Sequence, residues 1–295
     1  MAKKRVHGGK APRPRNLAGV RPNKRLGQNF LIDEEVISTI IEASGVTKDT
    51  LVLEIGPGTG ALTLPLAESA GHVIAVDLDP DMIDGLRIKT FGMDNVELIQ
   101  GDILETDIKR ISEESMKEHG LSELRIIGNL PYYITTPIIM KLLDSDTGAK
   151  SITVMMQKEV ADRISSAPGS RIYGAISVAV QYYCSVTKIT DVPKEAFVPR
   201  PKVASTVLRL QPLGEKQVLV KDEKMLLRCV KAGFAQRRKT LLNSLSSAGG
   251  TDKDTVRRIL EAADIDPGRR AETLTVEEFG RIADKFSDEH NQRNS

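Results

Sequence analysis

The stretch LVLEIGPGTGA, residues 51–61, decides the fold of this 295-residue chain. A short apolar run at residues 51–55 leads directly into a turn that contains three glycines, and an apolar stretch of helical length follows. Glycines at a strand-to-helix turn let the backbone bend tightly and approach a ligand, because no Cβ stands in the way. The stretch therefore predicts the ligand-binding turn of an α/β sheet.

Alternation of strands and helices continues on both sides of this turn. A helix is predicted over residues 34–43, with Asp33 as its N-cap and Gly45 at its end. Further strands are predicted at residues 73–76, 96–99, 124–127 and 152–156. These runs lack polar alternation, which is typical of a parallel sheet buried on both faces. We expect a Rossmann-like α/β sheet between two helical layers.

The pattern changes near residue 212. Residues 221–287 contain no convincing strand, and helical patterns occur at residues 225–235, 237–245, 254–263 and 276–286. We therefore expect three parts, which are a basic arm over residues 1–25, an α/β domain over residues 26–211 and a small helical domain over residues 212–295.

Composition excludes several classes of protein. With 40% hydrophobic and 28% charged residues, the chain is neither collagen-like nor disordered throughout. No uncharged apolar run approaches the roughly 20 residues that a membrane span needs, and no apolar segment follows the basic N-terminus as export would require. The two cysteines, Cys184 and Cys229, have no metal or redox spacing, and the four histidines are scattered. We expect a cytoplasmic protein without a metal site or a membrane partner.

Charge is distributed unevenly along the chain. Residues 1–32 carry nine Lys and Arg and no carboxylate. Subtracting these nine from 42 leaves 33 basic against 40 acidic residues, a net charge of −7 for the rest. A basic arm on an acidic body suits a polyanionic partner, although a solvated tail explains the arm equally well.

Acidic residues at the ends of the second and third strands indicate a nucleoside cofactor. Asp77 stands 21 residues after Gly56 and can accept hydrogen bonds from ribose hydroxyls. Asp102 can accept from an adenine amine with Ile103 beside the ring, unless it is simply a helix N-cap. The glycine turn alone fits both a dehydrogenase that binds NAD and a methyltransferase that binds S-adenosylmethionine.

The fourth strand ends in the tetrapeptide Asn129-Leu130-Pro131-Tyr132, which no dehydrogenase chemistry requires. The Asn129 side-chain oxygen and the Leu130 carbonyl can accept both protons of an exocyclic adenine amine and draw its nitrogen toward tetrahedral geometry. Pro131 fixes φ and holds that carbonyl outward, while Tyr132 offers an aromatic face to an extruded base. The alternative is an ordinary strand-ending turn.

Seven motifs in order make the chain resemble the KsgA family of rRNA adenine N6,N6-dimethyltransferases over residues 25–286. They are LGQNFL (residues 26–31), the glycine turn, GD (101–102), NLPY (129–132), FVPRPKV (197–203), QRRKTL (236–241) and RAE (270–272). The resemblance implies a methyltransferase domain and a helical domain that act on small-subunit rRNA within a pre-formed subunit, together with a role in ribosome assembly. Its implied substrate is a hairpin with two adjacent adenosines, each methylated twice.

The resemblance also assigns roles to residues of this chain. It places Gln28, Asn29 and Leu31 over S-adenosylmethionine, Gly56 and Gly58 at its amino-acid portion, Asp77 at the ribose, and Asp102 with Ile103 at the adenine, while Asn129 faces both the methyl donor and the target base. Leu78 is also expected to bind the cofactor. Family members commonly have Glu at the position of Asp77, so the ribose contact is expected to differ in strength.

An aromatic ring and basic residues complete the site that the resemblance implies. Phe197 matches the ring that stacks on the target adenine opposite Tyr132, its alternative being a core residue before a proline turn. Expected RNA contacts are Arg200, Lys202, Arg237, Arg238 and Lys239, although such clusters are often only solvated faces. Two other functions stay open, a large-subunit rRNA methyltransferase that confers antibiotic resistance and an assembly factor in which methylation is secondary.

Overall fold

The computed structural model describes residues 22–23, 26–216 and 218–294 of the chain. Most of the predicted basic arm, residues 1–25, therefore lies outside the described residues. The largest element is a seven-stranded sheet with the strand order β4-β3-β2-β5-β6-β9-β7. Its first five strands run parallel, at β4 (Val96–Gln100), β3 (His72–Asp77), β2 (Thr50–Ile55), β5 (Glu123–Asn129) and β6 (Ser151–Gln157). All five match predicted strands to within two residues, which confirms the α/β class.

Two antiparallel strands at one edge were not predicted. β9 (Ser205–Pro212) pairs with β6, and β7 (Cys184–Val192) pairs with β9. β7 mixes exposed polar and half-buried residues because it is the edge strand, so it lacks the apolar run that identified the other strands.

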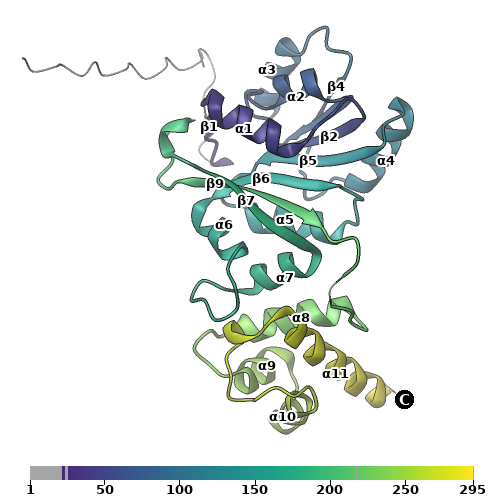
Figure 1. Ribbon diagram of the computed structural model, residues 1–295, viewed down its shortest axis with the longest axis vertical. Coiled ribbons are helices and arrows are strands. Elements are labelled where there is room, and N and C mark those ends of the chain that lie inside the picture. The colour runs from purple at the N-terminus through teal and green to yellow at the C-terminus, as the bar shows by residue number, and fades with distance from the viewer. Residues whose placement is uncertain (1–21, 24–25, 217, 295) are drawn as a thin grey trace, which may run out of the picture.

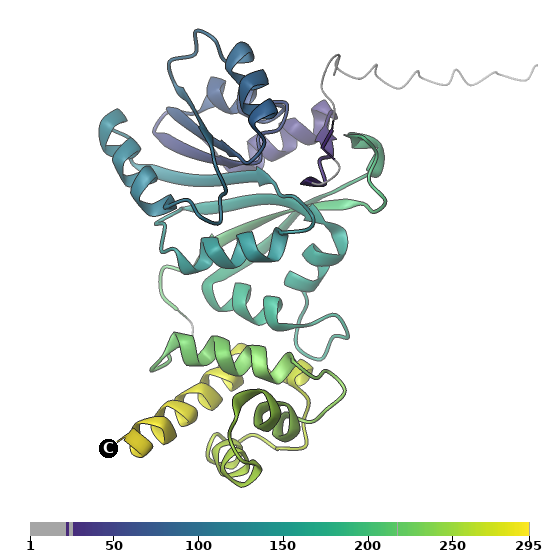
Figure 2. The same cartoon turned by 180° about the vertical axis from the view of Figure 1, so that it is seen from behind.

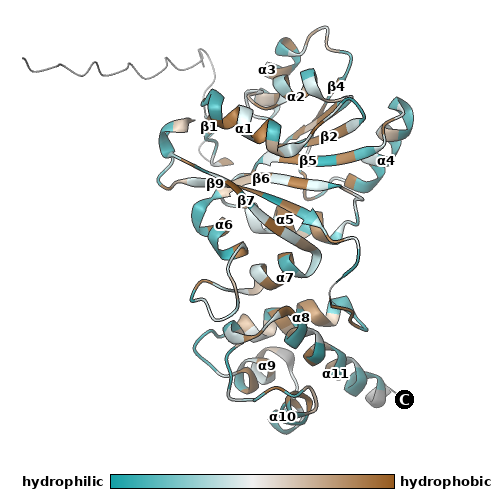
Figure 3. Ribbon diagram, in the orientation of Figure 1, coloured by the Kyte–Doolittle hydropathy of each residue, from teal (hydrophilic) through white to brown (hydrophobic). Residues whose placement is uncertain are grey.

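Helices cover both faces of the sheet, as the sequence predicts (Figures 1 and 2). On one face, α1 (Glu34–Ser44) and α2 (Thr63–Ser69) pack side chains such as Ile40 and Leu66 against the strands. On the other, a second apolar cluster joins the strands to α4 (Ile108–His119), α5 (Thr135–Asp144), α6 (Lys158–Ile164) and α7 (Ala175–Tyr183). α3 (Pro80–Lys89) leans on β3 and β4 at the edge. Figure 3 shows hydrophobic residues concentrated on the strands and on α5.

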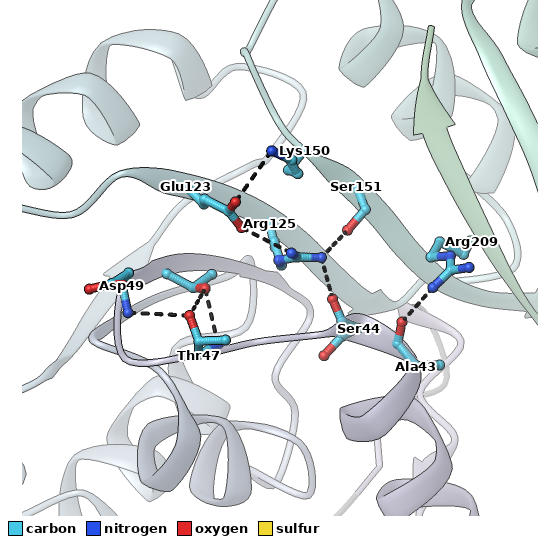
Figure 4. Close-up of polar contacts among 10 residues, drawn as sticks. Ala43, Ser44, Thr47, Asp49, Glu123, Arg125, Lys150, Ser151 and Arg209 are labelled. Carbon is cyan, nitrogen blue, oxygen red and sulfur yellow. Dashed lines mark hydrogen bonds and ion pairs between the residues drawn. The ribbon is translucent and has the colours of Figure 1, made fainter. Parts of the chain in front are cut away.

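α1 is fastened to the sheet by two arginines at its C-terminal end (Figure 4). Arg125 donates to the Ser44 carbonyl at 2.7 Å, and Arg209 donates to the Ala43 carbonyl at 3.2 Å. Arg125 also forms an ion pair with Glu123 at 2.9 Å. Cations placed here satisfy free helix carbonyls and complement the negative end of the helix dipole. The anchor matters for the site because α1 follows β1 (Phe30–Leu31) in the chain, and β1 contains Leu31, one of the residues expected at the cofactor.

Residues beyond β9 form a group of helices packed against α7. These are α8 (Glu223–Phe234), α9 (Leu241–Gly249), α10 (Lys253–Ala262) and α11 (Val276–Asn294). Their apolar cluster also includes Tyr173, Val178 and Tyr182 from the α6–α7 region. In the part of the chain that the structure describes, no strand lies beyond Pro212, and no helix is long and apolar enough to cross a membrane.

One predicted helix starts later than expected. The sequence pattern predicts a helix over residues 237–245, but α9 begins at Leu241, and residues 235–238 form a turn after α8. The amides of Leu241 and Leu242 donate to the carbonyls of Arg269 and Pro267. These contacts with another loop satisfy helix-end amides, which sequence periodicity does not reveal.

Candidate active site

A cavity opens at the carboxyl ends of the parallel strands. It lies where the strand order changes direction, because β3 and β4 follow β2 toward one edge of the sheet and β5 and β6 follow toward the other. Ligands of open α/β sheets bind at such a switch point. The structure brings all ten expected cofactor residues to the wall of this one cavity, which are Gln28, Asn29, Leu31, Gly56, Gly58, Asp77, Leu78, Asp102, Ile103 and Asn129. Leu130 and Tyr132 line it as well.

The glycine turn requires glycine for physical reasons, among others at the two positions assigned to the cofactor. Gly56 and Gly58 have φ values of 68° and 53°, in the left-handed region. A Cβ on Gly58 would lie 3.2 Å from the Phe30 ring, and one on Gly56 would lie 3.4 Å from the Asn129 carbonyl. The turn is thus packed between the segment before α1 and the end of β5.

Asp77 both lines the cavity and holds the glycine turn. Its Oδ2 accepts from the Gly58 amide at 3.1 Å, and its Oδ1 accepts from the Asp79 amide at 2.9 Å. Burial raises the pKa of Asp77, and the charge of Asp79 adds to the effect while the amides oppose it. Because a carboxylate has about four acceptor positions, this side chain can still accept from a ligand.

Asp102 is not a helix N-cap, so that alternative from the sequence is wrong. Its Oδ1 accepts from the Leu104 amide at 2.9 Å in a tight turn, and α4 starts only at Ile108 with Asp107 as its cap. Ile103 beside it is 5% exposed. The structure therefore places a carboxylate and an apolar side chain together at this end of the cavity.

Residues 26–31 form a segment along the cavity that is tied down at both ends. Gln28 Nε2 donates to Asp79 Oδ2 at 2.8 Å. Phe30 and Leu31 form β1, which pairs antiparallel with β8 (Phe197–Val198). Between them, the Asn29 carbonyl accepts from Asn129 Nδ2 at 3.2 Å. The segment thus joins the ends of β3 and β5 to the loop around Phe197.

The contact with Asn29 orients the side chain of Asn129. Because Nδ2 donates to a protein carbonyl, Oδ1 is the atom that remains as an acceptor at the end of β5. The next residue is held by its backbone, since the Leu130 amide donates to the Met155 carbonyl at 3.0 Å. Tyr132 OH forms a 2.6 Å hydrogen bond with Ser205 Oγ, and burial raises its pKa. These hydrogen bonds hold the tetrapeptide in place at the wall of the cavity, where it offers acceptors and an aromatic ring.

Phe197 lies elsewhere than the stacking role requires. Its side chain is 2% exposed and belongs to the apolar cluster under α1, with Leu31, Ile37 and Val207. It does not line the cavity. The expectation of an open aromatic face is therefore wrong for this structure, and the core-residue alternative agrees with it.

The basic residues expected to contact RNA differ in whether their side chains already bind other groups of the protein. Arg200 forms an ion pair with Glu195, and Lys202 is exposed in the same loop. Arg237 donates to the carbonyls of Arg171 and Tyr173, each at 2.8 Å. Arg238 and Lys239 are exposed in the turn between α8 and α9. Arg237 therefore ties this turn to the α6–α7 loop, while Arg238 and Lys239 face solvent.

Glu54 is a site residue that the sequence motifs did not single out. It lines the cavity from β2 but is only 1% exposed, and its Oε2 has no hydrogen-bond partner in the described part of the chain. Burial raises the pKa of Glu54 to about 8. A buried carboxyl with one oxygen that has no partner fits a ligand that brings a cation or a donor. A lone acidic residue in an apolar strand was the signal that could have identified it.

The side chains fit S-adenosylmethionine. This cofactor has ribose hydroxyls and an adenine amine to donate to Asp77 and Asp102, and cationic groups that suit the carboxyl of Glu54. Among the residues that the structure describes, no group of three or more His, Cys, Asp and Glu side chains is placed to hold a metal ion.

Comparison with known proteins identifies relatives over nearly the whole chain. A ribosomal RNA small subunit methyltransferase A of Alkaliphilus oremlandii is 44% identical over 266 residues, which are 90% of this chain and 92% of the relative. The protein of the same name from Oceanobacillus iheyensis is 45% identical over 265 residues, 89% of this chain and 90% of the relative.

Solved structures agree with these relatives in fold. A dimethyladenosine transferase from Plasmodium falciparum has a TM-score of 0.73 at 25% identity, covering 88% of this chain and 98% of that one. The 23S rRNA methyltransferase ErmE has a TM-score of 0.62 at 25% identity, covering 88% and 100%. The family model for ribosomal RNA adenine dimethylase matches residues 19–287, and this chain therefore belongs to the ribosomal RNA adenine dimethylase family.

Proposed function

We propose that this chain transfers methyl groups from S-adenosylmethionine to the N6 amines of two adjacent adenosines in a small-subunit rRNA hairpin, giving N6,N6-dimethyladenosine. The observation that carries the proposal is the end of β5, where Asn129 Oδ1 is held as an acceptor at the wall of the cofactor cavity. Relatives named for the small subunit are 44–45% identical, whereas the 23S rRNA enzyme is 25% identical. This difference favours the small-subunit substrate over the large-subunit alternative.

The chemistry asks the protein for positioning rather than for a strong base. An exocyclic adenine amine is a poor nucleophile because its lone pair is delocalised into the ring. Asn129 Oδ1 and the Leu130 carbonyl accept hydrogen bonds from its two N–H groups, which directs the lone pair toward the methyl group. When bound, S-adenosylmethionine would supply the methyl group and the driving force: the nitrogen–carbon bond forms as the carbon–sulfur bond breaks, S-adenosylhomocysteine is the leaving group, and the surplus proton on nitrogen passes to water. Tyr132, anchored on Ser205, gives the extruded base a face to lie against.

Each part of the cofactor has a proposed place along the cavity. Asp77 accepts from the ribose, Asp102 with Ile103 holds the adenine, and Gly56 and Gly58 let the backbone approach the amino-acid end. Gln28, Asn29 and Leu31 cover it, and Leu78, 47% exposed at the rim, lies beside the ribose. Glu54 joins this set as the acceptor for a cationic group.

The proposed partner is small-subunit rRNA within a pre-formed subunit, with an accompanying role in ribosome assembly. Residues 26–211 carry the methyl transfer, and the helices of residues 212–295 contribute RNA contacts. Arg200, Lys202, Arg238 and Lys239 meet phosphates, whereas Arg237 acts through its support of the turn. The proposed location is the cytoplasm.

Methylation of isolated ribosomal subunits tests this function. Small subunits from cells that lack the protein should gain dimethyladenosine at two adjacent positions on incubation with protein and S-adenosylmethionine, as mass spectrometry of RNase fragments measures. Large subunits from the same cells are the control and should gain none. Methylation of the large subunits alone would overturn the proposed substrate.

A further inference from the structure

Tyr133 is a cavity residue to which neither the sequence motifs nor the proposed chemistry assigns a role. It follows Tyr132 directly and lines the same cavity, but its side chain is 54% exposed. An aromatic ring that is half exposed at the mouth of a binding cavity still has surface to bury when a ligand enters. Tyr132, by contrast, is held inward by Ser205.

The ring of Tyr133 lies against the segment that runs along the cavity. Gly27 has a φ of 60°, and a Cβ there would lie 3.6 Å from Tyr133 Cδ1, so the backbone packs on the edge of the ring. The neighbouring Gln28 is fixed to Asp79 at 2.8 Å. Tyr133 thus stands between a fixed piece of backbone and the open side of the cavity.

The polar groups around Tyr133 also suit a nucleoside, because they combine a hydrogen-bond donor with acceptors. Burial raises the pKa of Tyr133, and the charges of Asp102 and Asp77 raise it further. The phenol therefore stays protonated and can donate, whereas the two carboxylates can only accept. In the described part of the chain its hydroxyl has no hydrogen-bond partner in the protein, so a donor stands ready beside the acceptors assigned to the ribose and the adenine.

We propose that Tyr133 binds the cofactor directly and positions it. The ring of Tyr133 covers the nucleoside half of the cofactor, and the Tyr133 hydroxyl donates a hydrogen bond to that half. This inference rests on the proposed use of an adenosyl cofactor. It adds an aromatic wall and a donor to an end of the cavity whose assigned groups are carboxylates and aliphatic side chains. Its ligand is the nucleoside of the cofactor and not the target base, which the inference leaves to Tyr132.

Binding of S-adenosylhomocysteine, measured by calorimetry on the full chain, tests the proposal. Tyr133→Ala should weaken binding about 5- to 140-fold, the range expected from stacking of an aromatic side chain on a base. Tyr133→Phe should lose about 2- to 12-fold, because it keeps the ring and lacks the donor. Phe91→Ala is the control, since that ring is 91% exposed and outside the cavity. An unchanged dissociation constant in Tyr133→Ala would overturn the inference.

Two further comparisons locate the effect. Methylthioadenosine lacks the amino-acid half, and its affinity should fall in Tyr133→Ala by the same factor as that of S-adenosylhomocysteine. If wild type bound neither compound, the proposed cofactor itself would be wrong. If wild type bound both and the variant lost only S-adenosylhomocysteine, Tyr133 would act on the amino-acid half and the inference would fail.

Fluorescence gives a readout that a purely structural role would not change. The chain contains no tryptophan, so Tyr133→Trp introduces a single reporter at this position. Stacking on adenine should quench its emission in proportion to bound S-adenosylhomocysteine, while Phe91→Trp should not respond. Emission from Tyr133→Trp that stayed constant through saturation, as followed by calorimetry, would contradict the contact.

Discussion

At the scale of single residues, the site relies on side chains that hold the protein together and are also free to meet a ligand. Asp77 fixes the glycine turn through Gly58 and keeps acceptor positions free. Asn129 uses its amide nitrogen to bind Asn29 and keeps its oxygen free. Loss of either side chain therefore has a structural effect besides its functional one, and tests must separate the two.

Asn129→Ala should lower turnover far more than it weakens cofactor binding. The Asn129 side chain is proposed to act on the amine when the nitrogen lone pair becomes exposed. Removal of the side chain should therefore raise mainly the free energy of the transition state. A fall of about 100-fold or more in kcat is expected, by analogy with the removal of one positioned hydrogen-bonding group, with less than about a tenfold change in the dissociation constant of S-adenosylhomocysteine. Single-turnover methyl transfer and calorimetry measure both. Turnover near wild type would remove Asn129 from the chemistry.

Glu54→Gln should make the empty protein more stable at pH 8. The pKa of Glu54 is raised to about 8 by burial, so the folded state keeps a proton that the unfolded state loses near pH 4.5. Stability therefore falls as pH rises between these values, by up to about 1.4 kcal/mol per pH unit. The glutamine side chain has no such charge, so the difference in unfolding free energy between the variants should grow with pH. Urea unfolding at pH 5, 6.5 and 8 measures it.

The same substitution should weaken cofactor binding, because the amide cannot balance a cation. A variant that is more stable and binds less tightly would show that Glu54 is retained for the ligand. Equal stability of both proteins at pH 5 and pH 8 would mean that the carboxyl finds a partner when it ionises.

At the scale of elements, what the sequence could predict depends on how local the signal is. The five parallel strands are buried on both faces, so their apolar runs identify them within two residues. β7 and β9 pair with each other across the proline-containing loop around Phe197, and α9 starts where a distant loop accepts its first amides. Such long-range contacts leave no mark in local periodicity. Glu54 and Tyr133 lie next to the glycine turn and the tetrapeptide without belonging to either motif, and the fold shows that both line the cavity.

Phe197→Ala should destabilise the fold, because β8 places this ring in the core beneath α1. Removal of a buried phenylalanine side chain costs about 3–5 kcal/mol, and urea unfolding should show a loss in this range. Phe197→Leu should retain most of the stability, since it refills much of the space. Phe91→Ala, at an exposed ring, should change little. A Phe197→Ala variant that had wild-type stability but had lost methylation would instead support stacking of Phe197 on the target base.

At the scale of the whole molecule, the helices beyond β9 depend on the sheet domain through α7 and its loop. Tyr173 and Tyr182 are buried in the cluster of α8–α11, and Arg237 joins the α8–α9 turn to the loop that carries Tyr173. The turn with Arg238 and Lys239 is thus held at a fixed place relative to the cavity. A rigid basic turn can set how far a bound phosphate backbone lies from the methyl-transfer site, which a flexibly attached domain would not do.

Substitution of Arg238 and Lys239 together by Gln should weaken RNA binding and leave the protein otherwise unchanged. Removing one phosphate-binding cation should lower the slope of log affinity against log salt by about 0.7 to 0.9, so the slope of the double variant should fall by up to about 1.8 while its affinity for S-adenosylhomocysteine stays the same. Arg237→Gln should instead lower the unfolding free energy, since it breaks two hydrogen bonds between the parts of the molecule. Arg110→Gln with Lys117→Gln, on α4, is the control with an equal change in charge. Filter binding of small subunits over a range of salt concentrations measures the slopes. Equal slopes for the two double variants would show that the contribution is general charge rather than binding at this turn.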